Sequence, residues 1–453
     1  MNSIRLTRKV PHRQPRPHPR KSSLCHSTKR VYVLGLLIVA AMMASSHRQS
    51  RFENANNFYT DDDIVTPMGG NTIWPSSKSD MQLLLRRATQ QVQHDEMNGV
   101  DFFWQLPPPL TNPSPHSSSD NIQGILLLVH GCHRSGMDWW PATHDGECPQ
   151  CLGYPEESAI AQIALTKLRF LVVSMSSSES TTACWYQRDG PRAARVLQQI
   201  QYLTPPQTPV FALGVSSSGK FVSQTLPQHF PTLDGFVSLI SPPPASPVRM
   251  QSKRGETRGQ PLLPGVFITM PKDVPVQNQV SNFVAKFRTK RYNYPYKHIT
   301  VPVDYPVTAS FLQERSGGVI NPWTARQLVT AFRQVPKMLT PHNDTLASDP
   351  RAINRAWKKA IERIIDQQHL ENDIYELLNV AYGKHDVTRD GVEEGLAWLL
   401  DKAQRRRQRT NEAKQQTKPS KTKKGDDSAK DEEDESGDEA ADGDQAAKES
   451  SGK

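Results

Sequence analysis

Large aliphatic side chains are missing from the end of the chain. Beyond residue 400 no aliphatic residue larger than Ala occurs up to Lys453, and Lys, Arg, Asp and Glu stand among Ser and Gly. Such a composition cannot bury enough apolar area to offset the entropy lost on ordering. This absence excludes a folded C-terminal domain, and we predict a charged disordered tail over residues 403–453.

Acidic residues are absent from the first thirty positions, where Lys and Arg are frequent. The net charge of +9 therefore resides largely in a basic tail, residues 1–30, and not in a groove of a folded domain. We expect no nucleic-acid partner. Binding of nucleic acid through this tail is the least favoured alternative, and it predicts an affinity that falls steeply with salt.

Long hydrophobic runs are also scarce. The uncharged run over residues 31–44 follows the basic tail, and at about 1.5 Å per helical residue it spans only about 21 Å. We predict an uncleaved signal anchor over residues 31–46, which contacts the membrane and leaves the N-terminus cytosolic and the bulk of the chain in the ER or Golgi lumen or outside the cell. A cleaved signal peptide of a secreted protein, or an organellar presequence, is the alternative.

Cysteine is rare, with five residues in the chain. Cys25 lies in the basic tail, and the other four form an even set of disulfide candidates: Cys132, Cys148, Cys151 and Cys184. Tetrahedral zinc needs four ligands, and the single CxxC at residues 148–151 would need help from Cys132, Cys184, His133 or His144. In a translocated domain we expect structural disulfides, no metal and no cofactor, with a small zinc module as the alternative.

The middle of the chain alternates buried-strand and helix patterns. After a spacer with an edge segment over residues 47–121, apolar runs at 124–131, 170–175, 210–213, 233–240, 264–270 and 298–303 predict strands, and helices are expected at 155–167 and 191–202. This order predicts an α/β fold, a mostly parallel sheet with helices on both faces, over residues 122–402. Helices at 322–333 and 350–367 are expected to form helical cap elements around residues 322–378, before a last helix at 388–400.

The segment 209–229 reads as a strand, a tight turn and a helix. Its turn, Gly214-Val-Ser-Ser-Ser-Gly219, resembles the nucleophile elbow of the α/β-hydrolase family, with Ser216 in the place of the nucleophile. The family pattern has glycine two residues after the nucleophile, where this chain has Ser218. An alternative register makes Ser217 the nucleophile, with Gly219 two positions later.

The same resemblance implies an acid and a histidine later in the chain. Asp273, directly beyond the strand at 264–270, is the expected acid, and His385, in a loop before the last helix, is preferred to His342 as the histidine. The resemblance also implies an oxyanion hole formed by the backbone amides of Cys132, in the segment His-Gly-Cys, and Ser217.

Together these segments resemble the α/β-hydrolase family over residues 122–400, and they are most similar to a plant and algal group of secretory-pathway proteins with the same His-Gly-Cys, CxxC and elbow segments. The resemblance implies a membrane-anchored or secreted serine hydrolase that cleaves a small-molecule or acyl ester, thioester or amide. The alternative is a catalytically inactive hydrolase fold that acts as a lumenal binding or scaffolding module.

Overall fold

A single eight-stranded sheet forms the centre of the protein, with the strand order β1-β2-β4-β3-β5-β6-β7-β8. The computed structural model describes residues 85, 87–109, 122–141, 148, 150–250, 262–288, 295–302, 304–365 and 368–416. β2 pairs antiparallel with both of its neighbours, β1 and β4, and all the other pairings are parallel. In chain order the strands are β1 (Gln93–Met97), β2 (Val100–Gln105), β3 (Gly124–Val129), β4 (Phe170–Met175), β5 (Val210–Val215), β6 (Gly235–Leu239), β7 (Gly265–Thr269) and β8 (Tyr296–Thr300). The predicted fold class, α/β with a mostly parallel sheet, is confirmed.

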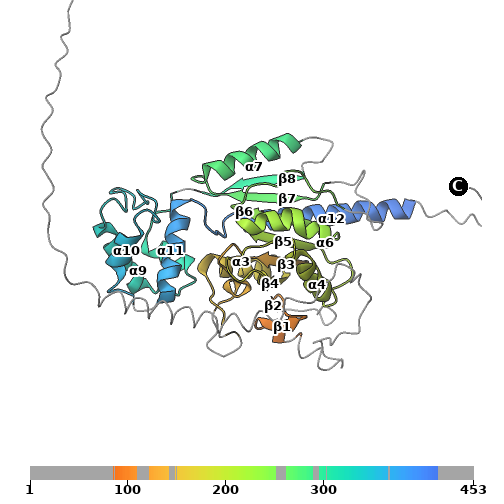
Figure 1. The fold of residues 1–453 in the computed structure, drawn as a ribbon, viewed down its shortest axis with the longest axis horizontal. Helices are drawn as coiled ribbons and strands as arrows, with labels where there is room; N and C mark the ends of the chain where they lie inside the picture. Colours follow the sequence, from red (N-terminus) through yellow and green to blue (C-terminus); the bar gives the residue numbers. More distant parts are fainter. Residues whose placement is uncertain are drawn as a thin grey trace, which may run out of the picture.

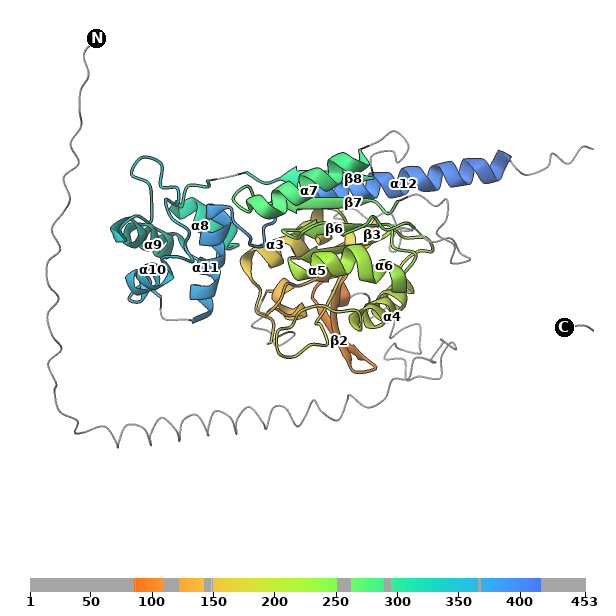
Figure 2. The same cartoon turned by 45° about the horizontal axis from the view of Figure 1, so that its top comes forward.

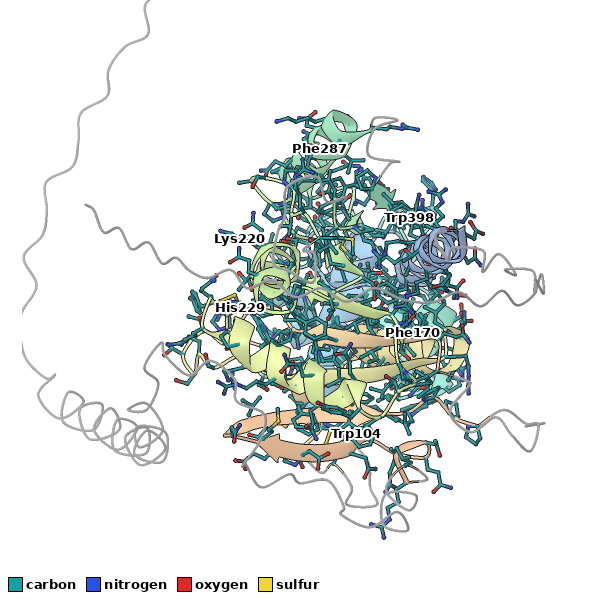
Figure 3. All side chains as sticks on the ribbon, turned by 90° about the vertical axis from the view of Figure 1, so that its right-hand side faces the viewer. Trp104, Phe170, Lys220, His229, Phe287 and Trp398 are labelled. Atoms are coloured by element: carbon teal, nitrogen blue, oxygen red, sulfur yellow. A yellow bond between two sulfur atoms is a disulfide. The ribbon has the colours of Figure 1, made fainter. Side chains whose placement is uncertain are left out.

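Helices cover both faces of the sheet (Figure 1). Alternate side chains of each central strand point to opposite faces, and so the strands feed two separate cores: Leu127 packs in one and Leu126 in the other. The first face carries α4 (Asp189–Gln201), the segment α5 (Ser217–Lys220), η4 (Phe221–Thr225) and α6 (Leu226–His229), and α7 (Val274–Phe287). The second carries α3 (Pro155–Gln162), η3 (Ile163–Lys167) and α12 (Val392–Gln416). In Figure 3 Lys220 and His229 lie on one side of the strands and Trp398 on the other.

A second helical unit, residues 305–382, has a core of its own. Trp357 and Phe332 are fully buried there, with other apolar side chains that all come from this unit. Figures 1 and 2 both place this helical unit beside the sheet and not over one of its faces. Its helices are α8 (Ala309–Arg315), α9 (Pro322–Gln334), α10 (Asn354–Ile361) and α11 (Gln368–Tyr382).

Several element boundaries differ from the sequence prediction. The sheet domain begins before the predicted boundary at residue 122: an Asn98-Gly99 turn with positive φ at both residues joins β1 to β2 in a hairpin, and β2 is the edge segment expected within residues 47–121. β8 begins two residues before the predicted strand, and α10 is shorter than the predicted helix at 350–367. The helix α7, which starts directly after Asp273, was not predicted.

The last helix is much longer than expected. α12 ends at Gln416, past the predicted boundary at residue 402. Ala403 is buried, and Arg406 and Arg407 form ion pairs with Asp234 on the sheet domain. The Ala, Gln, Arg and Lys residues that follow favour helix by intrinsic propensity, so the segment continues as helix without apolar burial.

The basic tail at 1–30, the predicted signal anchor at 31–46 and the remainder of the charged tail, residues 417–453, lie outside the described residues. Among the residues that the structure describes, no helix combines the length and apolar character needed to span a bilayer.

Candidate active site

Ser216 occupies a strained turn at the end of β5. Its backbone has φ 55° and ψ −116°, a conformation that costs a non-glycine residue of order 1–3 kcal/mol. Its N–H still donates to Leu239 O at 2.9 Å, which prolongs the β5–β6 ladder, and α5 starts at the next residue. Because the chain reverses sharply between strand and helix at this residue, Ser216 is only half-buried, whereas the strand before it is buried.

The glycines on both sides of Ser216 are needed for close packing. A Cβ atom on Gly214 would lie 2.3 Å from the carbonyl oxygen of Ser218, and one on Gly219 would lie 2.4 Å from Cβ of Ser241. The helix therefore packs against the sheet through Gly219, one position later than in the family pattern. Ser218 is fully buried, and its hydroxyl accepts the N–H of Val215 at 2.6 Å.

Asp273 follows β7 and stands at the N-cap of α7 without capping it. An N-cap aspartate usually accepts a hydrogen bond from the first turn of its helix, but Pro lies at N2 and no such bond forms. The carboxylate Oδ2 instead lies 2.6 Å from Nδ1 of His385. The side chain of Asp273 is 12% exposed, so this contact is partly shielded from water.

His385 completes a chain of contacts with Ser216 and Asp273. Its Nε2 lies 3.1 Å from Oγ of Ser216, while Nδ1 faces the Asp273 carboxylate. Since a carboxylate only accepts, Nδ1 carries the proton, and Nε2 is then free to accept the Ser216 hydroxyl. The structure thus brings together the three predicted side chains, although 169 and 112 positions separate His385 from the other two. His342 lies in an exposed turn of the helical unit.

The loop after β3 lies against the elbow. A Cβ on Gly131 would be 3.8 Å from Cβ of Ser216, and Sγ of Cys132 is 3.0 Å from Oγ of Ser217, whose hydroxyl donates to it. Within the described part of the chain, no acceptor takes the N–H of Cys132 or that of Ser217. These two backbone donors beside Ser216 are the pair predicted for the oxyanion hole. The hydroxyl of Ser217 faces Cys132, whereas that of Ser216 lies within hydrogen-bond distance of His385, which favours the Ser216 register.

A buried histidine and a disulfide hold this loop. Nδ1–H of His130 donates to Gly131 O at 2.7 Å, and Nε2 accepts the N–H of Ser177 at 3.1 Å. Burial lowers the pKa of His130 to about 4, so the ring stays neutral and keeps this tautomer. Cys132 is disulfide-bonded to Cys184, which ties the loop to the segment after β4.

The CxxC cysteines form the second disulfide. Cys148 and Cys151 are bonded to each other and buried in the core on the α3 face. All four cysteines of the predicted even set are therefore paired, and these thiols are not available as zinc ligands. No cluster of three His, Cys, Asp or Glu side chains suited to a metal ion occurs among the described residues.

A group of buried charges, which the sequence did not predict, lies behind the loop. Glu157 on α3 and Glu376 on α11 are both buried, and Arg134, two residues after Cys132, lies 3.7 Å from the Glu376 carboxylate. Burial raises the pKa of Glu157 to about 7 against the opposing effect of Arg134, and burial likewise raises the pKa of Glu376. Both carboxyl groups therefore hold a proton more readily than an exposed glutamate does.

Arginines of the helical unit form a further set of contacts around the His385 loop. Arg315 on α8 bridges Glu156 of α3 and Asp390, and Arg351 contacts the loop backbone beside His385. No motif marks these arginines in the sequence, because each pairs with residues at least 33 positions away.

No family model matches the chain, and no curated protein matches it either. Solved structures with similar folds include an α/β-hydrolase enzyme from a Medee basin deep-sea metagenome library, with 11% identity, a TM-score of 0.30 and coverage of 60% of this chain and 98% of that one. A CIB-like hydrolase from Thermoplasma acidophilum has 14% identity, a TM-score of 0.27 and coverage of 47% and 86%. Dienelactone hydrolase from Anabaena variabilis has 13% identity, a TM-score of 0.28 and coverage of 47% and 87%. At these identities and TM-scores, none of the three structures carries an argument about this chain.

Proposed function

We propose that the protein is a serine hydrolase that transfers the acyl group of a small-molecule ester, thioester or amide to water. The observation that carries the proposal is the continuous chain of contacts from Ser216 through His385 to Asp273, with 3.1 Å and 2.6 Å between the atoms. These distances are those of a nucleophile, a general base and the group that orients the base.

In the first step Ser216 Oγ attacks the substrate carbonyl carbon while His385 Nε2 takes the hydroxyl proton. Asp273 holds the Nδ1 proton and stabilises the imidazolium that forms. The amides of Cys132 and Ser217 donate to the developing oxyanion. The imidazolium then protonates the leaving alcohol, thiol or amine, and an acyl-serine remains.

In the second step water replaces the leaving group. His385 accepts a proton from the water, the hydroxide attacks the acyl carbon, and the collapse of the second tetrahedral intermediate returns the proton to Ser216 Oγ. A carboxylic acid and the free enzyme result, so that atoms and charge balance without a cofactor.

The alternative is an inactive fold that serves as a binding module, and two features could favour it: the serine at position 218 and the distance of His385 along the chain. The hydroxyl of Ser218 is hydrogen-bonded to the backbone N–H of Val215, and Gly219 provides the close contact between helix and sheet. The histidine loop reaches the elbow in space. Neither feature therefore favours the inactive module.

The full-length protein treated with a fluorophosphonate probe tests the proposal, because the probe phosphonylates an activated serine. We expect labelling of the wild type, none of Ser216→Ala, and labelling of the matched control Ser217→Ala, which keeps its backbone amide. Hydrolysis of p-nitrophenyl acetate should follow the same order. Absence of labelling in the wild type would favour the binding module.

For the compartment, we propose a membrane anchor at residues 31–46 or secretion, as in the plant and algal secretory group that the sequence resembles. The pairing of all four cysteines in the domain supports an oxidising compartment. Protease treatment of sealed microsomes tests this proposal: a C-terminal tag that resists digestion until detergent is added indicates a lumenal domain, and a tag that is digested at once refutes it.

A further inference from the structure

We propose that Arg351 of the helical unit is a positioning residue for His385, so that the reactivity of Ser216 depends on the helical unit as well as on the sheet domain. This inference rests on the proposed function. It assigns to the helical unit a part in building the site, in addition to any role as a cover.

Arg351 lies in the turn before α10 and contacts three consecutive residues, 384–386, of the loop that carries His385. Its Nη1 donates to the carbonyl oxygen of Lys384 at 2.8 Å, and its Nη2 donates to that of His385 at 2.7 Å. The same Nη2 is 3.2 Å from the carboxylate of Asp386. The planar guanidinium suits this arrangement, because its donors diverge in a fixed geometry that a lysine ammonium lacks.

The histidine backbone needs such a restraint. His385 has φ 42°, in the left-handed region that non-glycine residues occupy only when their surroundings impose it. Its ring is 43% exposed, so packing contributes little to its orientation. Asp273 holds the ring through Nδ1, while the place of the His385 backbone depends on the polar contacts of the loop, so that a carbonyl released from Arg351 would let the backbone relax.

The loop has separate attachments to the sheet domain and to the helical unit. On the sheet side the N–H of Lys272, next to Asp273, donates to Gly383 O at 3.0 Å. On the side of the helical unit there are two attachments: the contacts of Arg351, and the ion pair between Asp349 and Lys384 at 3.2 Å. Without the attachments to the helical unit His385 would keep a tether two residues before it, but none at its own carbonyl.

The expected consequence is kinetic. Displacement of a catalytic group by about 1 Å can cost about 100-fold in rate. We therefore expect Arg351→Ala to react with the fluorophosphonate probe about 10- to 100-fold more slowly than the wild type. Arg351→Lys should fall between the two, because an ammonium can satisfy one carbonyl while it keeps the charge beside Asp386.

Arg333→Ala is a matched control. Arg333 also makes a two-point contact, through Nε at 3.0 Å and Nη2 at 2.6 Å, but with Asp344 at the surface of the same helical unit. The substitution Arg333→Ala removes one guanidinium and one ion pair and leaves the contacts of the His385 loop in place. We expect Arg333→Ala to label at the wild-type rate, with a Tm close to that of Arg351→Ala.

Added guanidinium separates positioning from general stability. Millimolar guanidinium chloride or ethylguanidinium should restore part of the labelling of Arg351→Ala and leave the wild type unchanged, since the small cation can donate to the vacated carbonyls. Labelling of Arg351→Ala at the wild-type rate overturns the inference, as does slow labelling that no guanidinium rescues and that Arg333→Ala shares.

If Arg351→Ala does not fold, Arg351→Lys decides, and a wild-type rate for that variant also overturns the inference. A wild-type protein that the probe does not label would instead refute the proposed function, and this inference with it. The two failures are thus distinct.

Discussion

The substitution Ser218→Gly would make the elbow match the family pattern, yet we predict that it destabilises the protein. The Ser218 side chain is fully buried between β3 and β5. Its oxygen accepts the N–H of Val215 at 2.6 Å, and its hydroxyl hydrogen can donate to Val129 O at 2.8 Å or to Val215 O at 2.9 Å. The hydroxyl therefore connects the ends of two neighbouring strands at the point where the chain turns into α5.

The magnitude follows from what glycine would leave behind. A buried backbone N–H without a partner costs about 1–3 kcal/mol. Glycine in the first turn of the helix adds about 0.5–1 kcal/mol relative to alanine. We expect the free energy of unfolding to fall by about 2–4 kcal/mol for Ser218→Gly and by about 1–3 kcal/mol for Ser218→Ala, which keeps Cβ.

Urea unfolding followed by tryptophan fluorescence measures the loss, and fluorophosphonate labelling reports on the elbow in the folded state. Because Gly214 and Gly219 already provide the close contacts, we expect folded Ser218→Gly to label at nearly the wild-type rate. A variant as stable as the wild type or more stable would refute the role assigned to the hydroxyl.

Three further predictions concern the surroundings of Ser216. Replacing Cys132 and Cys184 together by Ser should lower the free energy of unfolding by about 4 kcal/mol, because the disulfide no longer restricts the loop that it closes in the unfolded chain. The same change should slow labelling, because the oxyanion loop loses its anchor. Calorimetry and labelling of the reduced wild type provide the check. Asp273→Asn should slow labelling by about 10⁴-fold, since the wrong imidazole tautomer is favoured, and a loss below tenfold would contradict the assigned role. Burial raises the pKa of Glu157 from 4.5 to about 7, so the native state binds more protons than the unfolded state in this interval. The free energy of unfolding should therefore fall as the pH rises from about 4.5 to about 7, by up to about 3 kcal/mol. Glu157→Gln should flatten this slope in urea titrations, and an unchanged slope would assign it to other groups.

The sheet could be predicted because its strands carry local signals. Buried on both faces, the central strands appear as continuous apolar runs, and β4 begins and ends at the residues predicted for it. The edge strand β1 has no such run, since its side chains alternate between half-buried and exposed. Its signal was the Asn98-Gly99 turn, which is typical of a two-residue hairpin.

The extent of α12 was predicted wrongly for a different reason. The boundary at residue 402 assumed that a segment without apolar residues has nothing to bind. Asp234, just before β6, instead pairs with both Arg406 and Arg407. An ion pair across 172 positions leaves no periodic trace in the sequence, so hydrophobic patterning could not detect it.

The contacts between the helical unit and the sheet domain are also polar contacts between distant residues, so hydrophobic patterning could not detect them either. These contacts affect how the site is built. The apolar core of the helical unit is separate from the two cores of the sheet. The two parts meet through a partly buried network around the buried Glu156, in which Arg315 pairs with Glu156 at 2.9 Å and with Asp390 at 2.6 Å, while the N–H of Arg389 donates to Glu156 at 2.7 Å.

Apolar surfaces can slide with little change in energy, whereas a buried carboxylate that loses its partner costs about 3–5 kcal/mol. Moving the helical unit away would take Arg315 from Glu156, which would keep only Arg389, and would also pull Arg351 from the His385 loop. Docking of the helical unit and placement of the histidine are therefore one coupled event. Arg315→Met, which removes the ion pairs but leaves Arg351 intact, should then slow labelling of Ser216 as well as lower Tm, and a loss of Tm with labelling unchanged would show that the two are independent.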